Sequence, residues 1–172
     1  KLNEIFRQAR ESRIIVNAHL INKGQMPLDE LPKKHAESME SDFYFIEQSD
    51  PENALKTIIK LTQDRIPRRF GFDPINDIQV LTPMHKGLVG AGNLNKALQK
   101  SLNPSEIGVI RGGVNYKTGD KVMQIKNNYD KDVFNGDIGV ITDINQDNQE
   151  VSITFDSRDI VYDFTDLDEI VL

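Results

Sequence analysis

Apolar residues recur at helical spacing in four stretches of the first two-thirds of the chain. Leu55, Ile58 and Ile59 follow an Asp50-Pro51-Glu52 step, which combines an N-cap residue, a proline at the first helical position and an acid in the first turn. Pro67 is expected to end that helix. The pattern predicts helices over residues 2–12, from Ser12 to Gly24, from Pro51 to Pro67, and from Leu94 to Leu102 before Asn103-Pro104.

Two short runs without polar interruption predict buried strands. They are Phe43-Tyr44-Phe45-Ile46 and Ile78-Gln79-Val80-Leu81, and each precedes one of the predicted helices. Strands and helices that alternate in this order imply parallel strands joined by right-handed crossovers. The first fold expectation is therefore an α/β layer. Residues 25–41 carry two prolines and no period, which predicts a surface loop.

After about residue 106 the helical period disappears, and four or five short strands are expected about ten residues apart. Val151, Ile153 and Phe155 alternate with polar residues, as a strand with one buried face requires. The predicted strands are residues 122–125, 138–144, 151–155 and 160–164. This pattern is typical of a small antiparallel barrel, so the predicted domains are residues 1–118 and 119–172.

The composition of the 172 residues, with 28% charged and 38% hydrophobic residues, is ordinary for a soluble globular protein. No apolar run approaches the roughly 18 residues that span a bilayer, and no signal segment opens the chain. The absence of cysteine excludes disulfides and Cys-ligated metal sites. These features predict a cytoplasmic protein without a membrane partner.

The net charge of −6 is unevenly distributed. Residues 117–172 carry 5 Lys and Arg against 13 Asp and Glu, so the remainder is slightly basic. The C-terminal part is therefore no simple polyanion-binding patch. Contacts with nucleic acid are expected from the first two-thirds or from a few local cations.

The stretch from Gly119 to Thr142 is the most informative part of the chain. It predicts a strand, an exposed polar connection, an Asn135-Gly136 turn and a second strand. The connection contains Asn127, Asn128, Tyr129 and Lys131. Aromatic rings in such loops stack on bases of single strands, so Tyr129 is a candidate platform with Asn128 beside it. The alternative is that Tyr129 packs on the edge of the barrel.

A second candidate site follows the strand predicted at residues 78–81. Thr82, His85 and Lys86 lie just beyond its carboxyl end, where open α/β sheets place ligands. The glycines at positions 87, 90 and 92 could form an anion-binding nest, although a tight turn is the simpler explanation.

Three other groups of residues do not predict a specific binding site. His19, His35 and His85 are scattered, so no metal site is predicted. The acids between Asp163 and Glu169 lack the spacing of a calcium loop. Arg65, Arg68 and Arg69 could touch phosphates, but a solvated helix end explains them as well.

Three blocks of residues resemble RecD-like DNA helicases, the family of the exodeoxyribonuclease V alpha subunit. The first runs Ile5-Phe6-Arg7-Gln8-Ala9, then Ile14-Ile15-x-Asn17-Ala18-His19-x-Ile21-Asn22-x-Gly24. The second runs Gln79-Val80-Leu81-Thr82-Pro83-Met84-x-x-Gly87 into Leu94-Asn95-x-x-Leu98-Gln99 and Leu102-Asn103-Pro104. The third is Gly119-Asp120-x-Val122-Met123-Gln124 through Phe134-Asn135-Gly136-Asp137-Ile138-Gly139. Three blocks in this order are far more specific than any one alone.

The resemblance implies part of an ATP-dependent 5′–3′ DNA helicase that acts in recombination and repair. The fold would be a partial RecA-like parallel-sheet domain, the second of two motor domains, followed by an inserted SH3-like barrel. The family's arginine in the first block reaches ATP across the cleft between motor domains, which gives Arg7 a catalytic and ATP-binding role. Gln8 could assist it or cap its neighbours. Thr82, His85 and Lys86 would lie near the DNA track.

The sequence lacks the phosphate-binding G-x-x-x-x-G-K-[ST] motif and an acidic pair that would hold magnesium. We therefore expect no ATP hydrolysis by this chain alone and no bound cofactor. ATP and Mg²⁺ are expected in the full-length enzyme, and the expected partners are single-stranded DNA and its N-terminal RecA-like domain. Two alternatives remain: the helicase part of a conjugative relaxase, and a non-enzymatic module that binds single-stranded DNA or protein.

Overall fold

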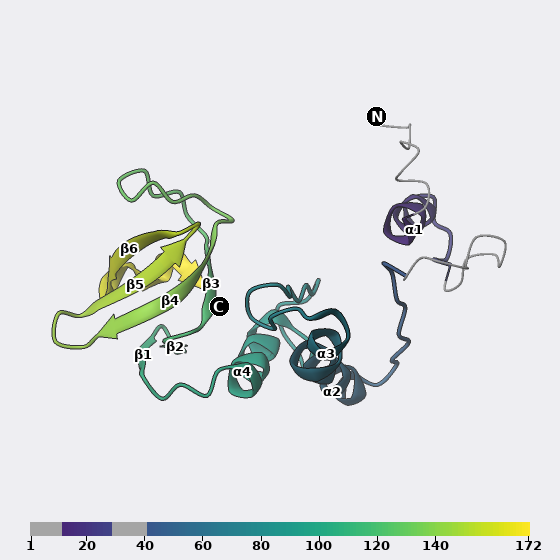
Figure 1. The fold of residues 1–172 in the computed structure, drawn as a ribbon, viewed down its shortest axis with the longest axis horizontal. Coiled ribbons are helices and arrows are strands. Elements are labelled where there is room, and N and C mark those ends of the chain that lie inside the picture. The colour runs from purple at the N-terminus through teal and green to yellow at the C-terminus, as the bar shows by residue number, and fades with distance from the viewer. Residues whose placement is uncertain (1–11, 29–40) are drawn as a thin grey trace. The chain divides into compact units, whose positions relative to one another are not determined.

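The computed structural model describes residues 12–28 and 41–172, which fall into two units that we treat separately (Figure 1). The first unit is Lys1–Gln48 and the second is Ser49–Leu172. The helix predicted over residues 2–12 lies outside the described residues, as do the candidate site residues Arg7 and Gln8.

The first unit contains helix α1, Arg13–Asn22. Ser12 is its N-cap as predicted, and its hydroxyl accepts a hydrogen bond from the Ile15 amide at 3.4 Å. The same hydroxyl donates to Asp42 at 2.6 Å, and this bond lowers the pKa of the Asp42 carboxyl. Asn17 is buried because its side chain exchanges two hydrogen bonds with the Leu28 backbone, at 2.7 and 3.2 Å. These bonds fix the segment after α1 against the helix.

Residues 43–46 do not form a strand in the structure, so the prediction of a strand there is wrong. Tyr44, Phe45 and Ile46 are about half exposed. A strand exists only where another strand satisfies its backbone N–H and C=O groups. The apolar run alone could not supply that partner.

In the second unit, residues 51–70 form consecutive helical segments: α2 (Pro51–Lys60), the π-helical turn η3 (Leu61–Arg65) and α3 (Ile66–Phe70). Asp50 caps α2 as predicted, accepting from the amides of Glu52 at 2.7 Å and Asn53 at 3.0 Å. The prediction that Pro67 ends the helix is wrong. The preceding turn widens to the π form, which accommodates a residue without an N–H, and the helix continues to Gly71.

Helix α4, Ala91–Leu102, covers the fourth predicted helix and ends at Asn103. The Gln63 side chain donates a hydrogen bond to the Ser101 carbonyl at 3.2 Å. Its side-chain oxygen accepts a second one from the Ser101 hydroxyl at 2.8 Å. These bonds hold η3 against α4. The two helical stretches form one layer, here called the helical layer.

Residues 78–81 are not a strand in this structure, which contradicts the prediction, and Leu81 is 86% exposed. Every strand pair within the described residues is antiparallel. The expected parallel RecA-like sheet is therefore not seen here. The observed architecture is helices followed by antiparallel sheets.

The C-terminal part forms a five-stranded antiparallel sheet in the order β6-β5-β4-β3-β7 (Figure 1). Its strands are β3 (Lys121–Gln124), β4 (Ile138–Asn145), β5 (Glu150–Phe155), β6 (Arg158–Asp163) and β7 (Ile170–Val171), with a 3₁₀ helix η4 (Phe164–Glu169) before β7. The predicted antiparallel strands are confirmed. Val151, Ile153 and Phe155 are all buried, as their alternation indicated.

The structure also contains a two-stranded hairpin that was not predicted, β1 (Gly108–Arg111) with β2 (Val114–Lys117). Gly112 and Gly113 turn it with φ of 56° and 79°, the left-handed backbone that a tight hairpin requires. Tyr116 of β2 packs into the core of the five-stranded sheet, and its hydroxyl donates to the Ile170 carbonyl at 3.0 Å. The predicted domain division after residue 118 stays a prediction.

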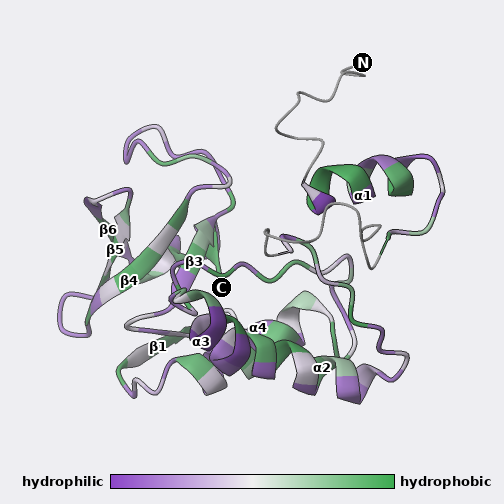
Figure 2. Cartoon of the chain, turned by 45° about the vertical axis from the view of Figure 1, so that its right-hand side comes forward, coloured by the Kyte–Doolittle hydropathy of each residue, from purple (hydrophilic) through white to green (hydrophobic). Residues whose placement is uncertain are grey.

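Hydropathy follows this architecture in the second unit (Figure 2). Helices α2 and α4 carry both hydrophobic and hydrophilic residues, as expected for helices with one buried face. The buried side of the sheet is apolar, with Val122, Ile141 and Tyr162 among its least exposed members. The connection between β3 and β4 contributes Val133 to this core, while other residues of the connection, among them Tyr129, are exposed.

Candidate nucleic-acid interface

The connection from β3 to β4, residues 125–137, is here called the tip loop. Asn128 and Val133 exchange backbone hydrogen bonds at 2.8 and 3.1 Å, which closes the loop on itself. Gly136 donates to the Gln124 carbonyl at 2.9 Å, and Val133 is fully buried. The tip loop is therefore anchored on the sheet core, and its exposed side chains are held at its outer end.

Tyr129 is the most exposed aromatic residue of the tip loop, at 76%. Its ring meets Phe134 edge to face, with centroids 6.0 Å apart and an interplanar angle of 76°. An edge contact supports the ring while leaving its surface open. The alternative that Tyr129 only packs on the edge of the barrel stays open beside the predicted role.

The side chain of Asn128 makes hydrogen bonds within the fold. Its side-chain oxygen accepts from the Lys131 amide at 3.1 Å, and its amide group donates to Glu169 at 3.0 Å. Glu169 also accepts from buried Gln124 at 3.2 Å. The structure thus uses Asn128 to hold the tip loop to the end of η4, and its role toward nucleic acid stays a prediction.

The cations around the tip loop are paired with carboxylates. Lys126 lies 2.7 Å from Asp168, Lys131 lies 3.5 Å from Asp166, and Arg158 lies 2.8 Å from Asp132. The Lys126–Asp168 pair raises the pKa of the lysine and lowers that of the aspartate. Contacts to DNA phosphates by these cations would first have to break ion pairs. The tip loop therefore offers an aromatic surface rather than a free positive charge.

The polar base of the tip loop is buried. The Tyr162 hydroxyl donates to the Gln124 side-chain oxygen at 2.9 Å, and neither side chain is exposed. Burial, reinforced by nearby Glu169 and Asp166, raises the pKa of Tyr162 to about 12. Lys131 lies 5.2 Å from the centre of the Tyr162 ring. This packing makes the base of the loop rigid.

The second candidate region, residues 82–90, is here called the α4 entry loop. Thr82 donates from its hydroxyl to the Val89 carbonyl at 2.8 Å and so closes the loop. His85 and Lys86 are exposed at the turn. The structure thus gives Thr82 a structural bond and leaves His85 and Lys86 accessible, and the DNA-binding role of all three remains a prediction.

The glycines of the α4 entry loop allow its tight backbone turn. Gly87 has a φ of 93°, and a Cβ on Gly90 would come within 2.5 Å of the Lys86 carbonyl oxygen. The amide of Gly90 donates to the Gly87 carbonyl, and that of Ala91 donates to Met84. Since these two amides bond within the loop, the tight-turn interpretation fits better than an anion-binding nest.

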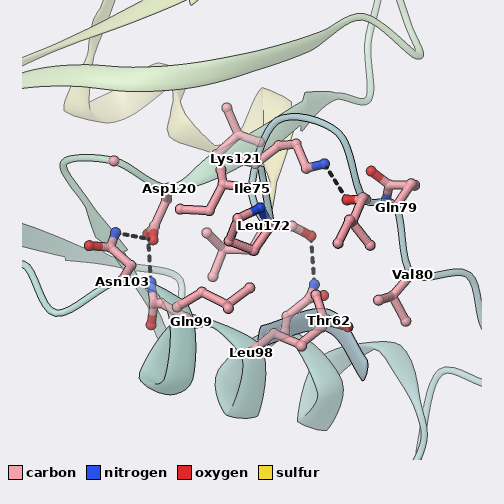
Figure 3. Close-up of a pocket in the computed structure, with 16 residues that line it drawn as sticks. Thr62, Ile75, Gln79, Val80, Leu98, Gln99, Asn103, Asp120, Lys121 and Leu172 are labelled. Carbon is pink, nitrogen blue, oxygen red and sulfur yellow. Dashed lines mark hydrogen bonds between the residues drawn. The ribbon is translucent and has the colours of Figure 1, made fainter. Parts of the chain in front are cut away.

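A cavity of about 130 Å³ lies between α4, residues 74–80 and β3 (Figure 3). Its lining includes the apolar side chains of Ile75, Leu98 and Val122. Sites for ligands the size of a nucleotide usually occupy about 300–1,000 Å³. This cavity is too small for ATP, so it belongs to the packing between the helical layer and the sheet.

Residues 12–28 and 41–172 contain neither a cluster of metal ligands nor a membrane-spanning helix. No three His, Asp or Glu side chains are arranged to hold a metal ion. In the same ranges, no helix has the length and hydrophobicity needed to cross a membrane.

Sequence reasoning missed two features. Phe134, the partner of Tyr129, lies within the stretch that was singled out, but its support of the tyrosine depends on the fold of the loop. The buried hydrogen bonds of Asp120 with Gln99 and Asn103 were also missed, although the Gly119-Asp120 step was visible. A buried aspartate has no sequence pattern of its own.

The comparisons with known proteins point to one class. Residues 94–155 match the family described as the ATP-dependent RecD-like DNA helicase SH3 domain. This range begins in α4 and ends with β5, so it contains the tip loop.

The chain is also 28% identical over 158 residues to the ATP-dependent RecD2 DNA helicase of Deinococcus radiodurans. The aligned region covers 92% of this chain and 19% of that relative, so the chain spans about a fifth of its length. A crystal structure of a double-mutant Pif1 helicase from Bacteroides is similar with a TM-score of 0.37 and 16% identity, over 67% of this chain and 31% of that one. This last likeness is too low to assign a fold. The first two matches confirm the resemblance: the sequence is similar to part of a RecD-like helicase, and residues 94–155 match the SH3 domain of that family.

Proposed function

We propose that this chain supplies the second motor domain and part of the single-stranded DNA track of an ATP-dependent 5′–3′ DNA helicase that acts in recombination and repair. The observation that carries the proposal is the exposed Tyr129, supported edge-on by Phe134, in an SH3-like domain that matches the RecD-like family. The related protein from Deinococcus radiodurans is named an ATP-dependent DNA helicase.

The chemistry of the two loops fits a single strand better than a duplex. A base freed from pairing stacks on an exposed aromatic ring, at roughly 1–3 kcal/mol per base. Lys86, exposed on the α4 entry loop, would contact a phosphate, and His85 could donate a further hydrogen bond beside it. The net negative charge of residues 117–172 opposes a broad contact with the duplex backbone.

The composition of the apolar segments 43–46 and 78–81 supports the assignment to a second motor domain. Both have strand-like composition, and no other strand pairs with them among the described residues. In the proposed full-length enzyme they join a parallel RecA-like sheet with strands from elsewhere in the protein. The exposed Leu81 side chain would then be covered.

ATP and Mg²⁺ belong to the N-terminal RecA-like domain in this proposal. Arg7, assisted by Gln8, would complete the ATP site from the opposite side when the two domains close. A planar, permanently charged guanidinium suits bidentate contact with phosphate. Hydrolysis would then be coupled to closure and to movement along DNA. The isolated chain is expected not to hydrolyse ATP.

The test compares Arg7→Ala with Arg10→Ala in the full-length enzyme, since both arginines lie in the same predicted helix. Arg7→Ala should lower the kcat of ATP hydrolysis about 10³-fold, the order expected for an arginine finger. Single-stranded DNA binding should change little, and Arg10→Ala should retain turnover. Equal turnover in both variants would remove Arg7 from the ATP site. Unwinding only of forked substrates with a free 5′ tail would support the direction, and a requirement for a 3′ tail would contradict it.

A further inference from the structure

Asp120 is a buried carboxylate with three hydrogen-bond donors. It is 4% exposed and lies in the turn between β2 and β3. One carboxylate oxygen accepts from the Lys117 amide at 2.7 Å and from the Gln99 side chain at 2.5 Å. The other accepts from the Asn103 side chain at 2.7 Å. Burial raises the pKa of Asp120, and the three donors partly oppose that rise.

Lys117 belongs to β2, whereas the other two donors, Gln99 and Asn103, come from the end of α4 (Figure 3). Gln99 lies in the last turns of α4, and Asn103 is the C-cap of that helix. Both side chains also bond the sheet side directly, Gln99 to the Asn115 carbonyl at 2.7 Å and Asn103 to the Thr118 carbonyl at 3.0 Å. The carboxylate is thus the common acceptor that joins the end of α4 to the start of β3.

Two further bonds flank this connection. Lys121 donates to the Ile78 carbonyl at 2.7 Å, and Asn95 of α4 donates to the Leu172 carbonyl at 2.5 Å. Both bonds are partly buried, and neither gathers several donors on one group. Between them lies the small cavity of about 130 Å³, so apolar packing alone does not fill this junction.

We propose that Asp120 is a positioning residue that fixes the SH3-like domain on α4, so that the tip loop and the helical layer move as one body. The functional part of this inference rests on the proposed helicase function. A body that rotates during an ATP cycle can carry Tyr129 with it only if the junction is stiff. A loose junction would let the tip loop lag behind the motor domain.

Removing the carboxylate leaves three donors without their acceptor in a buried site. Buried unpaired polar groups are unfavourable, so the junction would open toward water instead of keeping its geometry. Asp120→Asn is the sharpest change because it keeps the size of the side chain. It replaces one acceptor oxygen by an amide that faces other N–H donors.

The chain contains no cysteine, so two introduced cysteines can carry spin labels without removing others. Lys96→Cys on α4 and Asn148→Cys in the turn between β4 and β5 are both exposed positions. Double electron–electron resonance then measures the distribution of distances between α4 and the sheet. We expect a narrow distribution that Asp120→Asn broadens at least twofold. Asp143→Asn, which removes the same charge from an exposed position on β4, should leave it narrow.

An unchanged distribution in Asp120→Asn would overturn the inference. Circular dichroism shows whether that variant folds. Should it not fold, Gln99→Met serves instead, because it removes two of the junction bonds while keeping a good helix former. Broadening in Gln99→Met supports the inference, and a distribution as narrow as that of the unsubstituted chain contradicts it.

A kinetic measurement on the full-length enzyme distinguishes a positioning role of Asp120 from a general loss of enzyme structure. Asp120→Asn should raise the KM for single-stranded DNA about fivefold or more while the kcat for ATP hydrolysis stays within about twofold. A loss of kcat with unchanged KM would contradict the positioning role. Failure of the unsubstituted enzyme to bind single-stranded DNA would sink the proposed function, whereas the spin-label result would still decide whether Asp120 stiffens the junction.

Discussion

The Tyr129 ring rests edge to face on Phe134, with the two centroids 6.0 Å apart. The contact restrains the tyrosine side chain without covering its face. Because a restrained ring loses little further freedom when a base stacks on it, the proposed stacking of a base on Tyr129 would carry a small entropic cost. The pair lies at the outer end of a loop whose own base is buried, and this relationship leads to the first prediction.

Tyr129→Ala should weaken binding of single-stranded oligonucleotide by roughly 5- to 100-fold, the range of a stacked base at about 1–3 kcal/mol. Tyr129→Phe should bind within about twofold of the unsubstituted chain, since the ring remains. Fluorescence anisotropy with labelled oligothymidine measures both. Equal affinities for Tyr129→Ala and Tyr129→Phe would show that the ring does not contact DNA.

Lys86→Ala should weaken the salt dependence of binding. Each phosphate contact to a single strand contributes a slope of about −0.7 to the plot of log K against log salt concentration. Loss of the Lys86 contact should reduce the slope by about that amount. Lys100→Ala on α4, also an exposed lysine, is the matched control and should leave the slope unchanged. The same slope for all three proteins would place Lys86 away from the DNA.

Two glycines near the start of α4 should respond oppositely to alanine. A Cβ at Gly90 would lie 2.5 Å from the Lys86 carbonyl oxygen, whereas at Gly92 the nearest atom is 3.9 Å away. Gly90→Ala should therefore destabilise the chain and displace the α4 entry loop. Gly92→Ala should be neutral or stabilise it by about 0.5–1 kcal/mol. Urea denaturation compares them, and a midpoint for Gly90→Ala at or above that of Gly92→Ala would refute the close backbone approach.

Stability should fall in strongly alkaline solution because of Tyr162. Its pKa in the folded state is about 12, against an ordinary value of 10.0. Below pH 10 both states keep the proton, but from there to about pH 12 only the folded state does, so rising pH favours unfolding. Each pKa unit corresponds to about 1.4 kcal/mol.

Tyr162→Phe removes that ionisation and should show a shallower loss of unfolding free energy over this alkaline range. The variant should also be less stable at neutral pH, because the Gln124 oxygen loses its donor. Tyr129→Phe, at an exposed ring, is the control and should follow the unsubstituted protein. Parallel stability curves for Tyr162→Phe and the unsubstituted chain would contradict the buried, shifted tyrosine.

Local patterns predicted most of the helices and the strands of the five-stranded sheet that follow one another in sequence, but not the β1–β2 hairpin. The Asp50-Pro51 step marked the start of α2, and the alternation around Ile153 marked β5 and its buried face. The apolar runs at 43–46 and 78–81 had the composition of strands. A strand, however, forms only when a second segment pairs with it, and the sequence of one segment does not show whether that partner is present.

The candidate site was predictable only in outline. The exposure of Tyr129 followed from the polarity of its surroundings, but its support by Phe134 and the pairing of Lys131 with Asp166 depend on tertiary structure. The structural use of Thr82 and Asn128 was hidden for the same reason, since the hydroxyl and amide groups that bind ligands also close loops. Asp120 was visible as part of a motif, while two of its three donors, Gln99 and Asn103, come from a helix distant in sequence.

The most direct test of the proposed DNA track is an equilibrium titration of labelled oligothymidine onto this chain at two salt concentrations, with a duplex of equal length in parallel. Saturable binding that weakens at the higher salt concentration and favours the single strand is the predicted result. No change in anisotropy, or equal binding to the duplex, would contradict a single-stranded DNA track on these loops.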